Sequence, residues 1–352
     1  MKVFMLIKWL NYTGAPKMFM WLAHALAESG HDVRIFTFMQ SEDVTLNDNL
    51  KWTEQDLRNK NFFGRVRHIR TEIKKFDADV CISFLLDANV YNMFACKGLR
   101  TKSVVCERND PFKPGYWKLK FWKPFFRLAD GAVYQLDKVR EYYDNITVPT
   151  AVIPNPIVCH TDISCNPFSE RKKAIVTHGR LDLFQKRQDV LIGAFAKFVS
   201  EYPDYELHIF GAGPDEDKII EQITRLGLTN KVKLMGVAKS PQEVIKNYQI
   251  YVLPSDFEGI PNALIEALSV GLPCIATDCR PGGSASLIQD GVNGFLIPMG
   301  DEDALYQKLV CMVEHPDMAD QMGKNAMNVK QTLAPEKIIK LWNSYLNQVL
   351  NA

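Results

Sequence analysis

The chain lacks several features that would assign it to a special class of protein. No run of residues approaches the ~20 apolar residues that a membrane-spanning helix needs, and the apolar start at residues 2–7 is too short for a secretory signal. The eight cysteines form no C-x-x-C pair. We therefore expect buried thiols in a reducing cytosol rather than disulfides or a zinc site. At 352 residues without a repeat, the chain suits two globular domains in the cytoplasm.

Net charge is also nearly absent, at +1, but the charge is unevenly distributed. Residues 1–154 hold 23 Lys and Arg against 17 Asp and Glu, and the remainder holds 19 against 24. The two parts therefore carry +6 and −5. A basic first half without a nucleic-acid motif favours contact with an anionic membrane surface or an anionic acceptor, and we predict no nucleic-acid partner.

One basic and aromatic segment strengthens this expectation. Residues 113–127, from Lys113 to Arg127, contain five basic residues, six aromatic residues and no acidic residue. Such a mixture is typical of a segment that lies at anionic lipid headgroups. We expect peripheral contact with the inner face of the cytoplasmic membrane. The same composition also fits an amphipathic helix packed on its own domain, or stacking on single-stranded nucleic acid, which no other fold signal supports.

The most informative stretch covers residues 250–298. Residues 250–253 form an apolar run that predicts a buried strand, and Pro261 fits the first turn of a following helix. Gly271 is a natural end for that helix, with Pro273 just beyond it. Residues 274–277 predict a second buried strand. The order strand, loop, helix, strand is one βαβ unit.

Two glutamates flank the start of this predicted helix. Glu258 precedes the helix, and Glu266 lies in its second turn, so they are too far apart to share one proton. The helix N-terminus between them attracts phosphate through its free N–H groups and its dipole. Two hydroxyl acceptors on either side of an anion site match the shape of a nucleotide sugar.

The sequence around these glutamates resembles a known family. Glu258 begins the string Glu-Gly-Ile-Pro-Asn-Ala-Leu-Ile-Glu-Ala, with seven residues between it and Glu266. With the residues that follow, this string resembles the signature of retaining glycosyltransferases of family 4, which have the GT-B fold. The residues that follow and fit the signature are Gly271, Pro273, Asp278 and Gly294.

The resemblance implies an α/β architecture of two Rossmann-like domains that face each other across a cleft. Residues 1–155 would bind the acceptor and residues 170–333 the nucleotide sugar. Residues 334–352 would form a helix that crosses back to the first domain. Residues 150–156, with prolines on both sides of Asn155, resemble the stiff entry to the second domain.

The resemblance also implies roles for individual residues. Glu258 would hold sugar hydroxyls and Glu266 the ribose. Arg180 and Lys186 would stabilise the departing diphosphate, although they could also be two solvated loop charges. The backbone would contribute through Gly259 and Ile260, and Val237 falls where the family's backbone meets the nucleobase. The remaining donor-binding positions are Gly179, Gly211, Gly213, Pro261 and Asn262.

Two loops of the first half complete the expected site. Gly14 resembles the family's first glycine loop, which lies beside donor and acceptor, with one glycine where a pair is usual. Arg108 stands in a loop where family members often have a histidine close to the transferred sugar. Arginine cannot act as a base, but it can hold an acceptor phosphate or a donor oxygen. Alternatively, Arg108 forms a salt bridge with Asp110.

Two further motifs are weaker. Asp77-Ala78-Asp79 matches a metal-binding D-x-D pattern of another glycosyltransferase fold, but it directly precedes a strand, where polar residues are ordinary. We predict no metal and no cofactor beyond the nucleotide-sugar substrate. The Gly211-x-Gly213 pair lacks a third glycine at Glu216, which disfavours a nicotinamide dehydrogenase.

We therefore predict a retaining hexosyltransferase, with same-face displacement, because no side chain resembles an activated covalent nucleophile. The resemblance to bacterial polysaccharide-assembly enzymes favours a UDP-linked hexose or N-acetylhexosamine as donor. The acceptor would be a glycan or a polyprenyl-pyrophosphate-linked glycan. The alternatives are a sugar-nucleotide epimerase of the same fold and a GDP-mannose-dependent mannosyltransferase.

Overall fold

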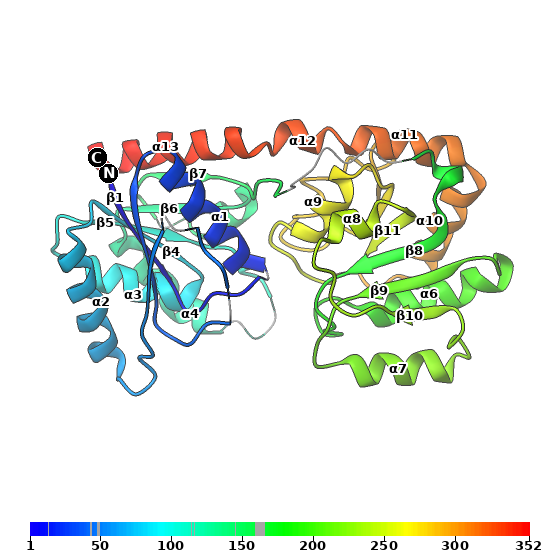
Figure 1. Ribbon diagram of the computed structural model, residues 1–352, viewed down its shortest axis with the longest axis horizontal. Coiled ribbons are helices and arrows are strands. Elements are labelled where there is room, and N and C mark those ends of the chain that lie inside the picture. The colour runs from blue at the N-terminus through cyan, green and yellow to red at the C-terminus, as the bar shows by residue number, and fades with distance from the viewer. Residues whose placement is uncertain are drawn as a thin grey trace. The chain divides into compact units, whose positions relative to one another are not determined.

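The computed structural model describes residues 1–12, 14–42, 44–47, 50–113, 115, 117–144, 146–158 and 166–352. The chain forms two compact units, shown in Figure 1. Unit 1 comprises Met1–Pro156 together with Pro335–Ala352, and unit 2 comprises Ile157–Ala334. Cys159 and Cys165 lie outside the described residues, so the expectation of free thiols applies here to the other six cysteines, all of which are unpaired.

In the described residues, unit 1 is built on a seven-stranded parallel sheet with the order β3-β2-β1-β4-β5-β6-β7. The central strands are almost wholly buried because they consist of continuous apolar runs, as both faces of a parallel sheet require. The strands are β1 (Lys2–Ile7), β2 (Asp32–Thr37), β3 (Lys51–Glu54), β4 (Val80–Phe84), β5 (Lys102–Cys106), β6 (Gly131–Tyr134) and β7 (Thr150–Val152).

Helices cover this sheet, and one of them comes from the end of the chain. The helices are α1 (Gly14–Glu28), α2 (Phe62–Phe76), α3 (Leu86–Cys96), α4 (Trp117–Trp122), the 3-10 helix η1 (Lys123–Leu128), α5 (Asp137–Tyr142) and α13 (Pro335–Asn351). Helix α13, red in Figure 1, packs beside α1. The Tyr345 hydroxyl donates to the carbonyl oxygens of Ala132 at 3.1 Å and Pro149 at 2.9 Å. The last helix therefore belongs to the unit that the first strand begins.

Unit 2 has a six-stranded parallel sheet in the described residues, with the order β10-β9-β8-β11-β12-β13. Its strands are β8 (Lys172–His178), β9 (Glu206–Phe210), β10 (Val232–Leu234), β11 (Tyr248–Leu253), β12 (Cys274–Thr277) and β13 (Phe295–Ile297). Its helices are η2 (Phe168–Glu170), α6 (Gln188–Glu201), α7 (Glu216–Arg225), α8 (Pro241–Ile245), α9 (Asn262–Ser269), α10 (Glu302–Glu314), α11 (Pro316–Ala326) and α12 (Val329–Thr332).

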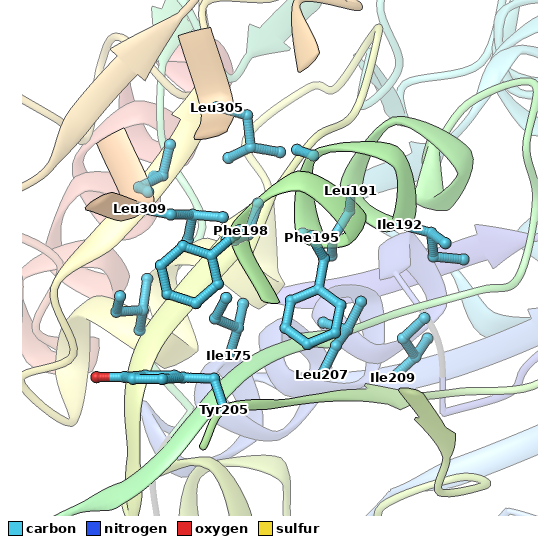
Figure 2. Packing of buried hydrophobic residues seen from close by; sticks show 14 of the residues in the cluster. Ile175, Leu191, Ile192, Phe195, Phe198, Tyr205, Leu207, Ile209, Leu305 and Leu309 are labelled. Atoms are coloured by element: carbon cyan, nitrogen blue, oxygen red, sulfur yellow. The ribbon is translucent and has the colours of Figure 1, made fainter. Parts of the chain in front are cut away.

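The core of unit 2 follows from the apolar spacing of α6. Residues three and four apart share one face of a helix, and this face carries Leu191, Ile192, Phe195 and Phe198. Figure 2 shows these side chains between the sheet and α10. The residues that they meet are Ile175, Tyr205, Leu207, Ile209, Leu305 and Leu309.

The strand orders determine where a ligand site is expected. In each sheet the order reverses next to the first strand, between β1 and β4 in unit 1 and between β8 and β11 in unit 2. Ligands of open α/β sheets bind at the carboxyl ends of the strands at this switch point. In unit 2 the loops after β8 and β11 begin there, and they carry Lys186 and Glu258.

Candidate active site

A buried ion pair joins the two loops at the switch point of unit 2. The Lys186 ammonium donates to Oε1 of Glu258, and both side chains are largely buried. The backbone reinforces the contact, because the Asp256 N–H donates to the Gln185 carbonyl at 2.9 Å. Burial of either charge alone would be costly, so each of the two buried charges requires the other. The structure thus brings together two of the residues that the sequence assigns to catalysis.

The neighbouring Arg187 ties the same loops together. Its backbone is in the left-handed region, with φ of 49°, at the N-cap position of α6. Its guanidinium lies 2.7 Å from an oxygen of Asp256 and 3.1 Å from an oxygen of Asp189. The hydrogen bonds to Asp189 and Asp256 raise the pKa of Arg187 above its already high ordinary value. This residue, which sequence reasoning missed, fastens the start of α6 to the loop of Glu258.

The second glutamate also has a basic partner from β8. Glu266 projects from α9, and its Oε2 lies 2.8 Å from Nε2 of His178, the last residue of β8. The two side chains are 10% and 9% exposed. The His178 ring also makes an edge contact with Tyr251 of β11, at 5.4 Å between centroids. Sequence reasoning missed His178 too, although its place directly before Gly179-Arg180 was a signal.

The helix that carries Glu266 begins one position later than predicted. Pro261 is the N-cap of α9 rather than a residue of its first turn, and its carbonyl accepts from the N–H groups of Leu264 and Ile265. The last helical residue is Ser269 and the C-cap is Val270, so Gly271 directly follows the C-cap, as the sequence predicts for a helix end. Gly271, with φ of 75°, then closes the end through its N–H bond to the Leu268 carbonyl. The helix keeps its N-terminus beside Gly259 and Ile260, as a phosphate site requires.

The glycines of the site allow its loops to lie against one another. A Cβ on Gly211 would overlap the Gly179 carbonyl oxygen, and one on Gly213 would overlap the carbonyl of Leu181. Gly283 has the same relation to the Gly259 carbonyl. These positions therefore have a packing reason to be glycine. Contact of Gly179, Gly211 and Gly213 with a donor stays a prediction.

Unpaired polar atoms gather around the same strand ends. Among the described residues, ten buried side-chain nitrogen or oxygen atoms have no hydrogen-bond partner, and six of them belong to this part of unit 2. Buried polar atoms are nearly always hydrogen-bonded, so such a group is typical of a polar ligand site. The six atoms are His178 Nδ1, Gln188 Oε1, Tyr251 Oη, Ser255 Oγ, Asp256 Oδ1 and Ser284 Oγ.

The electrostatics of the site make two potential nucleophiles inert. Burial, followed by the charges of neighbouring groups that include Glu266 and Glu258, raises the pKa of Tyr251 far above its usual range. Burial, together with the charge of Glu258, raises the pKa of Cys279 to about 11. At neutral pH both groups are therefore protonated and poorly nucleophilic.

Three of the predicted site residues are exposed. The Arg180 side chain is 67% exposed and lies 4.0 Å from Asp182. Val237 is 73% exposed, and Gly14 is an exposed first residue of α1 with φ of 41°. Thr13, beside Gly14, lies outside the described residues. The assigned contacts of Arg180, Val237 and Gly14 remain predictions.

Arg108 is buried inside unit 1. Its guanidinium lies 4.2 Å from the Phe84 ring centroid and 5.7 Å from that of Trp342 in α13. Nη1 donates to Oδ1 of Asn155 at 3.3 Å, and burial lowers the pKa of Arg108. Arg108 thus holds both the entry to unit 2 and the returning helix. Its contact with an acceptor or donor stays a prediction.

The D-x-D pair has structural partners. Asp77 is the C-cap of α2, with φ of 56°, and lies 2.7 Å from Arg100. Asp79 accepts from the Lys2 N–H at 2.7 Å, which joins it to the start of β1. No group of three or more His, Cys, Asp or Glu side chains within the described ranges could hold a metal ion.

The basic and aromatic segment has both buried and exposed side chains. Leu119 and Phe126 are buried in unit 1, whereas Trp117 and Phe121 are 67% and 60% exposed. Trp122 stacks on Phe62 of α2 at 5.7 Å between centroids. Pro114 and Tyr116 lie outside the described residues. None of the described helices is long and apolar enough to cross a membrane.

Comparisons with known proteins show the family of the chain. Residues 172–315 match the family described as glycosyl transferases group 1, and residues 12–160 match glycosyltransferase family 4. An uncharacterized glycosyltransferase of Methanocaldococcus jannaschii is 31% identical over 77% of this chain and 79% of its own length. A Campylobacter jejuni relative is 26% identical over the full length of both chains. It is named GalNAc-α-(1→4)-GalNAc-α-(1→3)-diNAcBac-PP-undecaprenol α-1,4-N-acetyl-D-galactosaminyltransferase. The crystal structure of Anabaena HepE with UDP and glucose superposes with a TM-score of 0.81 at 18% identity, over 99% of this chain and all of that one.

Proposed function

The chain belongs to the family 4, group 1 glycosyltransferases with the GT-B fold, and from this membership we propose that it transfers a hexosyl or N-acetylhexosaminyl unit from a UDP-sugar. The acceptor in this proposal is a glycan linked to a polyprenyl pyrophosphate. One observation carries the proposal: both glutamates of the motif are buried at the switch point, each beside a basic side chain from the β8 side.

The proposed binding mode uses these groups in order along the donor. Glu266 accepts from the ribose hydroxyls, and the N-terminus of α9 with Lys186 faces the diphosphate. Glu258 accepts from hydroxyls of the transferred sugar. Lys186 is held by Glu258 before the donor arrives, so its charge is already in place. A single well-placed donor to a developing negative charge is worth ~2.7–4 kcal/mol of transition-state stabilisation.

The proposed chemistry is displacement on one face of the sugar, with retention of configuration. The bond from the anomeric carbon to the diphosphate oxygen breaks as the bond to the acceptor oxygen forms. The acceptor's proton passes to the leaving diphosphate, so no protein base is required. The raised pKa values of Tyr251 and Cys279 agree with a mechanism that has no covalent sugar–enzyme intermediate at these residues. No metal takes part in this mechanism.

The proposed acceptor and location are supported by the C. jejuni relative and by the exposed aromatic side chains. That relative's name places its acceptor on undecaprenol pyrophosphate, and it matches this chain along its whole length. A lipid-linked acceptor lies at a membrane surface. We propose that Trp117 and Phe121, with the exposed Lys118 and Lys120 between them, contact anionic headgroups at the cytoplasmic face.

The test is a transfer assay with the purified chain, a panel of UDP- and GDP-sugars and a polyprenyl-pyrophosphate-linked acceptor. We expect transfer from one UDP-sugar, an unchanged rate in excess EDTA, and a product whose anomeric configuration, determined by NMR, is that of the donor. An inverted product would contradict the mechanism. Release of an epimerised sugar without acceptor would identify an epimerase. Transfer from GDP-mannose alone would mean that the donor is GDP-mannose and not a UDP-sugar.

Ligand-dependent stability gives an independent measure of the donor. A nucleotide at ~100 times its Kd adds ~2.7 kcal/mol to the free energy of unfolding, enough to raise the melting temperature by several degrees. We expect this increase with UDP and none with GDP or NAD. An increase with NAD alone would contradict the assignment of the whole site.

A further inference from the structure

We propose that His178 is a positioning residue, which orients the Glu266 carboxylate so that it accepts from the ribose hydroxyls of the donor. The proposal rests on the proposed function, because it assumes that Glu266 binds the nucleoside. It adds a residue outside the Glu258–Glu266 motif to the site. The observation behind it is the contact of 2.8 Å between His178 Nε2 and Glu266 Oε2.

The surroundings of the pair limit its movement. His178 is the last residue of β8, and its ring lies edge-on to Tyr251 of the adjacent strand β11. Glu266 belongs to α9, and its side chain is buried to the same extent as that of His178. Each partner is therefore held by a separate element at the switch point. A carboxylate fixed in this way loses less conformational freedom when a ligand binds than one on an exposed side chain.

The chemistry of the two groups defines the direction of the bond. An ionised carboxylate only accepts hydrogen bonds, so Nε2 of His178 must carry a hydrogen and donate it. A neutral His178 ring therefore has its hydrogen on Nε2, and Nδ1 is an acceptor that has no hydrogen-bond partner among the described residues. A carboxylate offers about four acceptor positions. The contact with His178 fixes the orientation of the Glu266 carboxylate, which is what recognition of two neighbouring hydroxyl groups requires.

A purely structural role for His178 predicts a different outcome from a positioning role. If the ring only fills space, its loss lowers the stability of the protein and lowers the affinity for every nucleotide equally. If the ring orients Glu266, its loss lowers the affinity for nucleotides that carry both ribose hydroxyls and leaves the affinity for their deoxy analogues nearly unchanged. The informative quantity is the ratio of Kd values for 2′-deoxy-UDP or 3′-deoxy-UDP and for UDP.

Two substitutions separate the functions of the ring. His178→Phe keeps an aromatic ring against Tyr251 but removes the donor, whereas His178→Gln keeps an N–H donor without the ring. The chain also offers a matched control in His208, a buried histidine of the adjacent strand β9. Nε2 of His208 lies 2.9 Å from a Glu206 carboxylate oxygen. His208→Phe thus removes a comparable histidine–glutamate contact from a strand interior rather than from the site.

We expect the wild-type chain to bind UDP about tenfold or more tightly than either deoxy analogue, since each analogue lacks one hydroxyl donor to a charged acceptor. In His178→Phe this preference falls below about threefold. His178→Gln restores most of it, and His208→Phe retains it in full. In transfer assays the KM for the donor rises in His178→Phe, while kcat stays within a few-fold of wild type.

Isothermal titration calorimetry of each variant with the three nucleotides measures the ratio directly. Because the ratio compares ligands on one variant, a general loss of stability cancels. Should the phenylalanine variant not fold, His178→Leu serves as the second apolar variant. An unchanged preference in a folded apolar variant, or no preference in the wild type, would overturn this proposal alone if the chain still transfers sugar. Absence of nucleotide binding and of transfer by the wild type would overturn the proposed function as well.

Discussion

The two glutamates of the motif differ from solvated surface carboxylates in that each is buried with a basic partner. Lys186 holds Glu258 and His178 holds Glu266, and both partners come from the end of β8 or the loop after it. Removing one member of the Lys186–Glu258 ion pair leaves the other charge uncompensated, at a typical cost of ~3–5 kcal/mol. Substitutions here therefore affect stability as well as chemistry, and conservative changes are the informative ones.

Glu258→Gln retains the size of the side chain and removes its charge. We expect kcat for sugar transfer to fall by roughly a hundredfold or more, the scale of a lost transition-state contact, with a change of only a few-fold in UDP affinity. The physical reason is that the proposed contacts of Glu258 are to the sugar, which changes during reaction, and not to the nucleotide.

Steady-state kinetics and calorimetry with UDP check this prediction on the same preparation. Glu216→Gln, on the exposed first turn of α7, is the matched control and should leave both quantities unchanged. Wild-type turnover by Glu258→Gln would exclude the proposed role for this residue.

Local spacing in the sequence identifies some of these residues and not others. Glu258 and Glu266 belong to one short motif, whereas the contact of His178 with Glu266 spans 88 residues and depends on β8 and β11 being neighbours. Arg108 shows the converse. The sequence places it at a strand end suited to substrate contact, but burial between Phe84 and Trp342 depends on tertiary packing that no local pattern contains.

Among the elements, α4 and η1 illustrate a question that composition leaves open. The sequence allows two interpretations of this segment, a helix that packs on its own domain or one that contacts a membrane. In the structure, the segment has both buried apolar side chains and exposed aromatic ones. Leu119 and Phe126 point into unit 1, and Trp117 and Phe121 are exposed. Through Phe62, the aromatic cluster continues to the exposed Phe63 of α2.

We expect the double variant Trp117→Ser/Phe121→Ser to bind vesicles of phosphatidylglycerol and phosphatidylethanolamine at least tenfold more weakly than wild type. Insertion of these rings removes apolar surface from water, and a fully buried side chain of this kind contributes ~1.5–3 kcal/mol. Co-sedimentation measures the partition.

Ile220→Ser removes an exposed apolar residue from α7 in the other unit and should not change binding. The wild-type chain should bind phosphatidylcholine vesicles weakly, because its lysines gain nothing there. Equal binding of wild type and double variant to the anionic vesicles would contradict membrane contact through this segment.

The two edge strands of unit 1 are elements that the sequence conceals. Strand β3 contains no buried residue and β7 only half-buried ones, so neither has the apolar run that predicts the interior strands. They are strands because β2 and β6 offer unpaired edges. The interior strands β4 and β11, by contrast, are fully buried and consist mainly of apolar residues, a pattern that is visible in the sequence.

At the scale of the whole molecule, unit 2 is inserted between two parts of unit 1. Helix α13 supplies unit 1 with the buried side chains of Trp342, Leu346 and Val349. We expect Leu346→Ala to lower the free energy of unfolding of unit 1 by ~2–5 kcal/mol, the usual cost of a cavity at a buried leucine.

Leu341→Ala, on the same helix but 47% exposed, is the matched control and should cost far less. Urea unfolding followed by tryptophan fluorescence measures both variants, and UDP affinity should be unchanged in each, because the proposed donor site lies in unit 2. Similar losses in the two leucine variants would mean that α13 contributes little packing to unit 1.

The return of α13 to unit 1 has a consequence for the synthesis of the protein. Domains generally fold as they leave the ribosome, the N-terminal one first. Here the residues of unit 2, 157–334, are complete before α13 is made. At ~5–20 residues per second, unit 1 waits on the order of ten to forty seconds for its last helix. Its surface beneath Trp342 and Leu346 is uncovered during that interval. Unit 1, which is translated first, therefore has an incomplete core for the longest time, and a chaperone can bind it during that time.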